Sequence, residues 1–185
     1  MALGTEALSA EDAHGQNTAI GHQALLVQNA GANAINVAVG YQAGKAVTTG
    51  QYNNLIGGQA GLALTTGGRN TVNGFGALGA DTLGSRAVAI GFGALDAQNF
   101  TTATDNYNVG VGYDAGGAVT TGVNNTLIGA LAGDALTDAD HNVAVGYNAL
   151  SADTLGSRSV AIGQGALENQ NFTTATDVYN VGFGS

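Results

Sequence analysis

A short unit recurs along almost the whole chain, and this repeat constrains the fold more than any other feature. The unit is Asn-x-small-(Val/Ile)-Gly-x-x-Ala-(Leu/Gly), anchored on its first glycine. Successive anchors are about 17 residues apart, with longer intervals at three insertions, and such a fixed period is typical of solenoids, in which insertions form loops on one face. The anchors are Gly4, Gly21, Gly40, Gly57, Gly74, Gly91, Gly112, Gly129, Gly146, Gly163 and Gly184.

Two positions show how regular the unit is. Alanine stands three residues after the anchor in all ten complete units, as at Ala43, Ala115 and Ala149. The next residue is always Leu or Gly, and these alternate in pairs, so the units form groups of four. Gly40 and Gly112 are equivalent positions in successive groups, which gives a superperiod of about 72 residues. We therefore predict one repeat domain, residues 1–185, with a superperiod of four units.

Asparagine stands four residues before the anchor in eight of ten units, including Asn36, Asn108 and Asn142. Stacked asparagines can hydrogen-bond along a parallel stack of strands. The segments that follow, such as 37–39 and 88–90, are rich in β-branched residues and bounded by Gly and Asn, which is typical of strands. The sequence thus predicts an all-β protein, a parallel β-solenoid or β-roll of about ten 17-residue coils.

Both faces of these strands are apolar. Val37 and Val39 lie on one face and Ala38 on the other, and neither face carries a charge in any coil. A small coil has one interior, so the second face needs another surface, and a copy of the chain is the simplest. We therefore expect a closed homo-oligomer, a homotrimer in our interpretation with two-fold symmetry as the alternative. A monomer would, in this interpretation, leave the alanine face exposed.

Composition excludes several functions. The chain has no cysteine, which excludes a disulfide scaffold, thiol catalysis and a Cys-zinc site. Four basic residues against thirteen acidic ones leave too little positive charge for a nucleic-acid groove. We also expect no membrane insertion, because no apolar run approaches the roughly 18 residues of a membrane-spanning helix, and no signal peptide, because the first residues lack a basic, apolar leader. Neither end carries a polar cap, so we interpret the chain as a segment of a longer shaft.

The repeat resembles known fibre proteins. Residues 36–44, N-V-A-V-G-Y-Q-A-G, and residues 17–25, N-T-A-I-G-H-Q-A-L, resemble the "NTAVGYQAL" repeats of bacteriophage tail-fibre proteins. They are also similar to the Ala-Ile-Gly repeats in the heads of trimeric autotransporter adhesins, whose repeat is shorter. The resemblance covers essentially the whole chain and implies a trimeric fibre that attaches to cell surfaces. It favours a phage tail-fibre shaft in the virion, with a bacterial surface adhesin or other extracellular filament as the alternative.

The inserted segments 98–105 and 170–177 are the candidate contacts with a partner, for which we expect a cell-surface glycan or protein receptor. They break the period, and exposed loops on a rigid scaffold often bind. The candidate residues are Asn99, Phe100, Thr101, Asn171, Phe172 and Thr173. Packing within the coil is the alternative interpretation of the same residues.

No pattern predicts an enzyme, a cofactor or a metal site. The G-x-G-x-x-G match at 74–79 falls on repeat positions, and the three histidines, His14, His22 and His141, are scattered. Asp81 with Arg86, repeated one superperiod later, suggests a local ion pair on the outer face. Thr-Thr pairs before glycine, as at 48–49, 65–66 and 120–121, suggest an ice-binding solenoid as a second alternative function.

Overall fold

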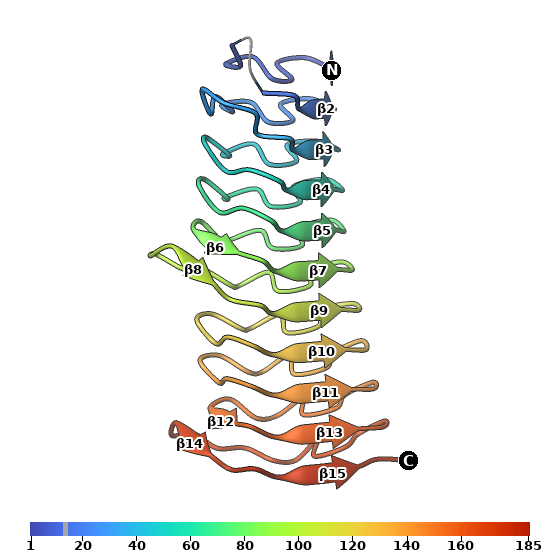
Figure 1. The fold of residues 1–185 in the computed structure, drawn as a ribbon. Helices are drawn as coiled ribbons and strands as arrows, with labels where there is room; N and C mark the ends of the chain where they lie inside the picture. Colours follow the sequence, from blue (N-terminus) through green and yellow to red (C-terminus); the bar gives the residue numbers. More distant parts are fainter. Residues whose placement is uncertain (13–14) are drawn as a thin grey trace.

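The computed structural model of the chain is a column of stacked coils (Figure 1). It describes residues 1–12 and 15–185, and over these the regular structure consists of fifteen short strands without a helix. One strand of each coil stacks on that of the next, and eleven of them form one sheet along the column. These strands are β1 (Ala2–Leu3), β2 (Thr18–Ile20), β3 (Val37–Val39), β4 (Asn54–Ile56), β5 (Thr71–Asn73), β7 (Val88–Ile90), β9 (Val109–Val111), β10 (Thr126–Ile128), β11 (Val143–Val145), β13 (Val160–Ile162) and β15 (Val181–Phe183).

The main sheet is parallel and keeps the register of the repeat. Leu127 in β10 pairs with Gly110 in β9 on one side and with Ala144 in β11 on the other, so equivalent positions stack. Neighbouring strands of a sheet lie about 4.8 Å apart, which makes the column roughly 50 Å long. The predicted all-β parallel solenoid with a 17-residue coil is confirmed.

The two four-residue insertions form small strand pairs beside the column. β8 (Thr104–Asp105) pairs with β6 (Gly84–Ser85), and β14 (Thr176–Asp177) pairs with β12 (Gly156–Ser157). Figure 1 shows that both pairs project on the side opposite the main sheet. They recur four coils apart, which corresponds to about 19 Å along the axis.

Each coil turns at residues with a left-handed backbone. In the coil of β10 these are Asn124, Leu131 and Gly133, with φ of 59°, 57° and 59°. The anchor glycine is required for a different reason, namely close stacking. Gly129 has φ of 130°, and a Cβ there would lie 2.5 Å from the carbonyl oxygen of Gly146 in the next coil. Because no side chain fits between successive anchors, this position tolerates only glycine.

Inside the column, the residues two before, four after and seven after the anchor fill a shared volume. In the coil of β10 they are Leu127, Gly133 and Leu136. A Cβ on Gly133 would lie 2.7 Å from Leu127 Cδ2 and 2.9 Å from Leu136 Cδ1, so the glycine makes room for two leucines. In the next coil Leu150 takes the place of the glycine, and its companions are an alanine and an aspartate. The paired alternation of Leu and Gly is therefore a rule of interior packing.

The alanine face of the strands lines this interior. Ala38, Ala89 and Ala144 are fully buried, whereas Val37 and Ile90 on the opposite face are each 37% exposed. The expectation that a monomer would expose the alanine face is therefore wrong. The narrow coil has room for small residues at the middle of the strand, and its β-branched neighbours point outward.

The asparagines before the strands form a buried ladder. Asn125 Oδ1 accepts from the backbone N–H of Asn142 at 2.9 Å, and Asn125 Nδ2 donates to the carbonyl of Ala139 at 2.7 Å. The ladder stops at Ala87, where the sequence has no asparagine, and Asn106 Oδ1 then accepts from the N–H of Asn108 at 2.9 Å. The ladder thus satisfies buried backbone groups at the corner of the coil, where the sheet does not reach them.

Candidate interaction surfaces

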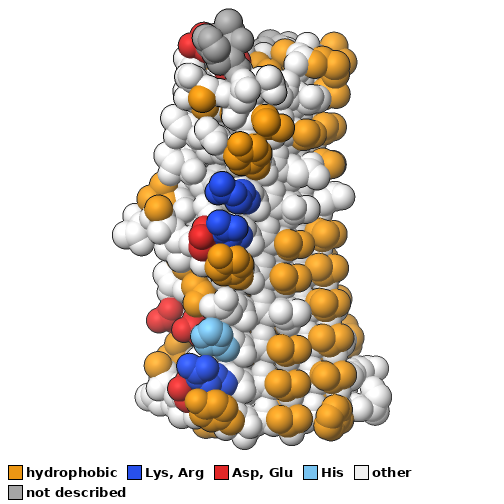
Figure 2. Space-filling view, viewed as in Figure 1, with side chains coloured by type: hydrophobic (Ala, Val, Ile, Leu, Met, Phe, Trp, Pro, Cys, Tyr) orange, Lys and Arg blue, Asp and Glu red, His pale blue; other side chains and the backbone are white. Residues whose placement is uncertain are grey.

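The outward face of the main sheet is an uncharged surface that runs along the column. Figure 2 shows two columns of hydrophobic side chains running from coil to coil along the axis, across the strands. They come from the first and third residue of each strand, which face away from the interior. The apolar members are Leu3, Ile20, Val37, Val39, Ile56, Val88, Ile90, Val109, Val111, Ile128, Val143, Val145, Val160, Ile162, Val181 and Phe183. A patch of this length is unusual on a monomeric soluble protein.

A polar patch interrupts the columns at β4 and β5; elsewhere from β2 to β15 the polar residues are single threonines of the first column, Thr18 in β2 and Thr126 in β10. Asn54 in β4 and Thr71 and Asn73 in β5 are exposed there and point outward with the valines and isoleucines of the other strands. In the part of the chain that the structure describes, none of the three side chains makes a hydrogen bond. One superperiod later Thr71 and Asn73 correspond to Val143 and Val145 in β11, whereas Asn54 corresponds to Thr126 in β10, so the polar pair in β5 is not a property of the repeat.

Exposed aromatic rings line one edge of this face. They occupy the position directly after the anchor glycine, and Phe75, Phe92 and Tyr113 are each more than half exposed. Their ring centroids are 5.7 Å apart from one coil to the next, with the rings nearly parallel. His22 stacks on Tyr41 in the same way at 5.5 Å. The sequence analysis missed this column, although aligning the units on their anchors would have found it.

A column that contains tyrosine and arginine lies along the other edge, five residues before the anchor, at Tyr52, Arg69, Arg86, Tyr107, Arg158 and Tyr179. The guanidinium of Arg86 lies 5.6 Å from the Tyr107 ring centroid, and Arg86 Nε is 2.8 Å from Asp105 Oδ2. The group recurs one superperiod later, where Arg158 lies 5.7 Å from the Tyr179 ring centroid and pairs with Asp177. The side chains are substantially exposed, so each pair stabilises the projecting strands only weakly. Hydrogen bonding and charge from Asp177 raise the pKa of Arg158.

These pairs correct the expected ion pair between Asp81 and Arg86. Asp81 is fully buried, and its carboxylate accepts from Gln98 Nε2 at 2.7 Å and from the backbone N–H groups of Gly84 and Phe100. Burial raises the pKa of Asp81, although these donors act in the opposite direction. The chain turns sharply between the two residues. The Asp81 side chain therefore points into the interior of the coil, and the Arg86 side chain points outward. The equivalent expectation for Asp153 and Arg158 is wrong for the same reason.

The candidate contact loops divide into buried and exposed parts. Phe100 is 6% exposed and packs within the coil, and Asn99 Oδ1 accepts from Thr82 Oγ1 at 3.0 Å. Thr101 and the two residues after it are exposed at the tip. In the second loop Asn171 and Thr173 are exposed and Phe172 is partly buried. The surface that a partner could reach is therefore the tip of each loop.

The structural repeat positions predicted from the sequence lie within the stacked coils. Asn36, Asn108 and Asn142 belong to the buried ladder, and the alanines three residues after the anchor, Ala43, Ala115 and Ala149, are fully buried. Gly40, Gly112 and Gly146 have φ of 139°, 141° and 134°, as close stacking requires. His22 and His141 are exposed in different columns, and His14 lies outside the described residues.

The threonine rows satisfy the protein's own backbone. Thr65 Oγ1 donates to the carbonyl of Thr82 at 3.0 Å, and Thr137 Oγ1 donates to the carbonyl of Thr154 at 3.1 Å. Thr48 and Thr120 donate to the next coil in the same way. The hydroxyl group of the first threonine in each pair is therefore not free to organise water, which counts against the ice-binding alternative for that row, whereas Thr49 and Thr66 are exposed.

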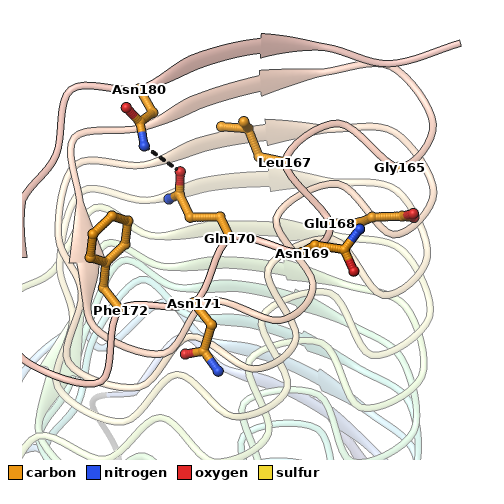
Figure 3. A pocket seen from close by; sticks show the side chains of 8 residues that line it. All are labelled: Gly165, Leu167, Glu168, Asn169, Gln170, Asn171, Phe172 and Asn180. Carbon is orange, nitrogen blue, oxygen red and sulfur yellow. Dashed lines mark hydrogen bonds between the residues drawn. The ribbon is translucent and has the colours of Figure 1, made fainter.

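A hollow lies at the uncovered end of the column. It has a volume of about 510 Å³ and is lined by residues of the last coils, among them Leu167, Gln170, Phe172 and Asn180 (Figure 3). Asn180 Nδ2 donates to Gln170 Oε1 at 2.7 Å there. The equivalents one superperiod earlier, such as Leu95 and Gln98, are fully buried beneath the next coil. The hollow is therefore a core layer without its neighbour, and no ligand needs to be invoked.

Acidic side chains gather on one flank without forming a metal site. Asp96 and Asp134 lie on either side of Asp114 along the column, and burial, followed by the charge of Asp114, raises the pKa of Asp96. Burial raises the pKa of Asp134 as well. Within residues 1–12 and 15–185, no three His, Asp or Glu side chains are grouped closely enough to hold a metal ion. The same residues contain no helix that is long and apolar enough to cross a membrane.

Comparisons with known proteins add no family. No family model matches the chain, and neither a curated protein nor a solved structure matches it. The class that the fold defines is a parallel β-solenoid with a 17-residue coil.

Proposed function

We propose that the chain is a non-enzymatic shaft segment of a bacteriophage tail fibre, built from three copies and supporting attachment to a host cell. The observation that carries this proposal is the outward face of the main sheet. Its strand positions are uncharged from β2 to β15, in a protein with a net charge of −9. A surface of this kind needs a cover that is itself apolar.

The size of this face suits association between copies. Eleven strands at about 4.8 Å and a width of about 10 Å, for three residues at about 3.3 Å each, give roughly 500 Å². A stable interface buries about 800 Å² on each partner, and the flanking aromatic column supplies further area. Three copies around an axis parallel to the column would each turn this one face inward, which closes the assembly without leaving an apolar face free.

The stack of coils has the internal contacts expected of a rigid rod. Each coil contributes stacked backbone pairs, an asparagine ladder and a filled interior, and the residues that carry them recur in nearly every coil. The hollow of about 510 Å³ lies at the end of the column and not within it. The coils therefore provide length and stiffness, and a tip outside this segment would select the receptor.

The decisive experiment measures mass in solution by light scattering after size exclusion. We expect three times the chain mass of 18.2 kDa. Replacing two outward residues, Ile90→Lys and Ile128→Lys, should reduce the mass to that of one chain, while Ala103→Lys at an exposed loop tip should not. A monomeric wild-type protein would overturn the proposal, and a dimer would overturn the three-fold symmetry.

The bacterial adhesin or extracellular filament stays as the second candidate, since it would use the same trimeric shaft. The neighbouring genes discriminate the two. Genes for tail assembly would support the phage fibre, whereas an export signal and a surface anchor on the same protein would support the adhesin.

A further inference from the structure

A repetitive interface has a problem of register. The outward columns repeat at each coil, about every 4.8 Å, so one copy could slide along another by a coil and recover nearly the same apolar contacts. Strand pairing shows the same weakness when a pattern does not specify one alignment. A shaft made of several copies therefore needs a feature that occurs at one height only.

The polar patch formed by Asn54, Thr71 and Asn73 is such a feature, because β5 is the one strand from β2 to β15 in the main sheet whose two outward positions are both polar. It lies in β4 and β5, and the columns are apolar from β7 to β15 apart from Thr126. All three side chains are exposed and free of internal hydrogen bonds over the described residues, so an amide or hydroxyl is available to each copy. A single buried asparagine fixes the register of coiled coils by the same principle.

We propose that this polar patch sets the axial register between copies of the chain, with the copies parallel and level. The inference rests on the proposed self-association and adds its alignment. With the copies level, the patch of each copy meets the patches of the others, and their amides and hydroxyls can pair. The apolar strands β7–β15 then cover one another along their whole length.

Other alignments bury the patch against hydrocarbon. A slip by one coil places Asn73 opposite Ile56 or Ile90, and its amide loses any partner. A buried unsatisfied polar group of this kind disfavours the slipped assembly by about 10- to 100-fold. An antiparallel pair could match patch with patch, but because the patch lies off the centre of the sheet, several apolar strands would then remain uncovered.

Disulfide trapping tests the register, because the chain has no cysteine of its own. Ile90→Cys and Val111→Cys occupy equivalent positions in adjacent coils, and the two variants are refolded together and oxidised. We expect links between two copies of the same variant. In an Asn54→Val, Thr71→Val, Asn73→Val background, we expect links between the two variants to increase at least about tenfold. The matched control replaces exposed Asn33, Thr49 and Thr66 by valine.

A charge-complementation assay gives an independent readout of the same contact. Asn73→Asp and Asn73→Lys should each weaken assembly, and an equimolar mixture should restore the oligomer if residue 73 meets residue 73. Restoration by Asn73→Asp with Ile90→Lys instead would indicate a slipped register and overturn the inference.

The possible failures are distinguishable. A wild-type protein that stays monomeric in light scattering removes the proposed self-association. An oligomer whose links stay between like variants in the valine background keeps the proposed function but overturns the role of the patch.

Discussion

Replacing Asn125 by alanine tests whether the asparagine ladder holds the coils together. The substitution removes the acceptor of the Asn142 N–H, at 2.9 Å, and the donor to the Ala139 carbonyl, at 2.7 Å. Asn125 and Asn142 are both fully buried, so water cannot replace either partner. An unsatisfied buried group costs about 1–3 kcal/mol, and two of them predict a loss of about 2–6 kcal/mol in the free energy of unfolding.

Urea unfolding at fixed protein concentration measures this loss, and hydrogen exchange locates it. The amide of Asn142 should exchange at least about tenfold faster, because about 1.4 kcal/mol corresponds to a factor of ten. Asn33→Ala, the same change at an exposed loop position, should alter the free energy by less than about 0.5 kcal/mol. If the two variants unfold alike and the Asn142 amide keeps its protection, the ladder does not stabilise the wall and the reasoning is refuted.

Three further predictions address the anchor, a buried carboxylate and the interior. Gly129→Ala should destabilise the protein by more than Gly76→Ala, because both have positive φ but only at Gly129 would the new Cβ lie within 2.5 Å of a carbonyl oxygen; equal urea midpoints would contradict this. Burial raises the pKa of Asp81, so the folded chain binds this proton more tightly than the unfolded chain. The free energy of unfolding should therefore rise as the pH falls from 7 through the raised pKa toward the unfolded value near 4. The slope of this rise should be smaller in Asp81→Asn. A wild-type free energy of unfolding that falls over this range would be the contrary result. Gly61→Leu should overpack the interior of the coil and lower the free energy of unfolding by about 1–3 kcal/mol. Leu55→Ala should recover part of that loss, and a thermal-melt series of the single and double variants can measure it.

The period of the chain carries most of the fold. The 17-residue spacing, the recurring positions within the unit and the β-branched segments predicted the coil, the strands and the asparagine ladder. The same pattern left open which strand face is inside, because Val37 and Ala38 are both apolar and alternation gives no preference. The structure resolves this through size, since the narrow interior accepts Ala38 and the larger residue remains outside.

The sequence predicted the contacts on the outer surface less well than it predicted the stacked coils. Arg86 pairs with Asp105, not with Asp81, because the chain turns between residues 81 and 86 and the insertion brings Asp105 beside the arginine. Phe100 lies in an inserted segment and was therefore expected to contact a partner. Its ring instead packs within the coil, and the exposed part of the insertion begins after it. Contacts between coils depend on where each corner falls, and one-dimensional spacing does not contain that information.

Compensation between neighbouring interior layers has a consequence for how such a rod can change its length. Gly116 is packed between Leu95 of the coil before and Leu127 of the coil after, and Gly44 lies between leucines in the same way. Loss of one coil would bring together layers whose volumes do not match, whereas loss or duplication of four would join the same kinds of layer as before. The length of the rod can therefore change in steps of one superperiod, about 19 Å each, without a change in the packing where the coils meet.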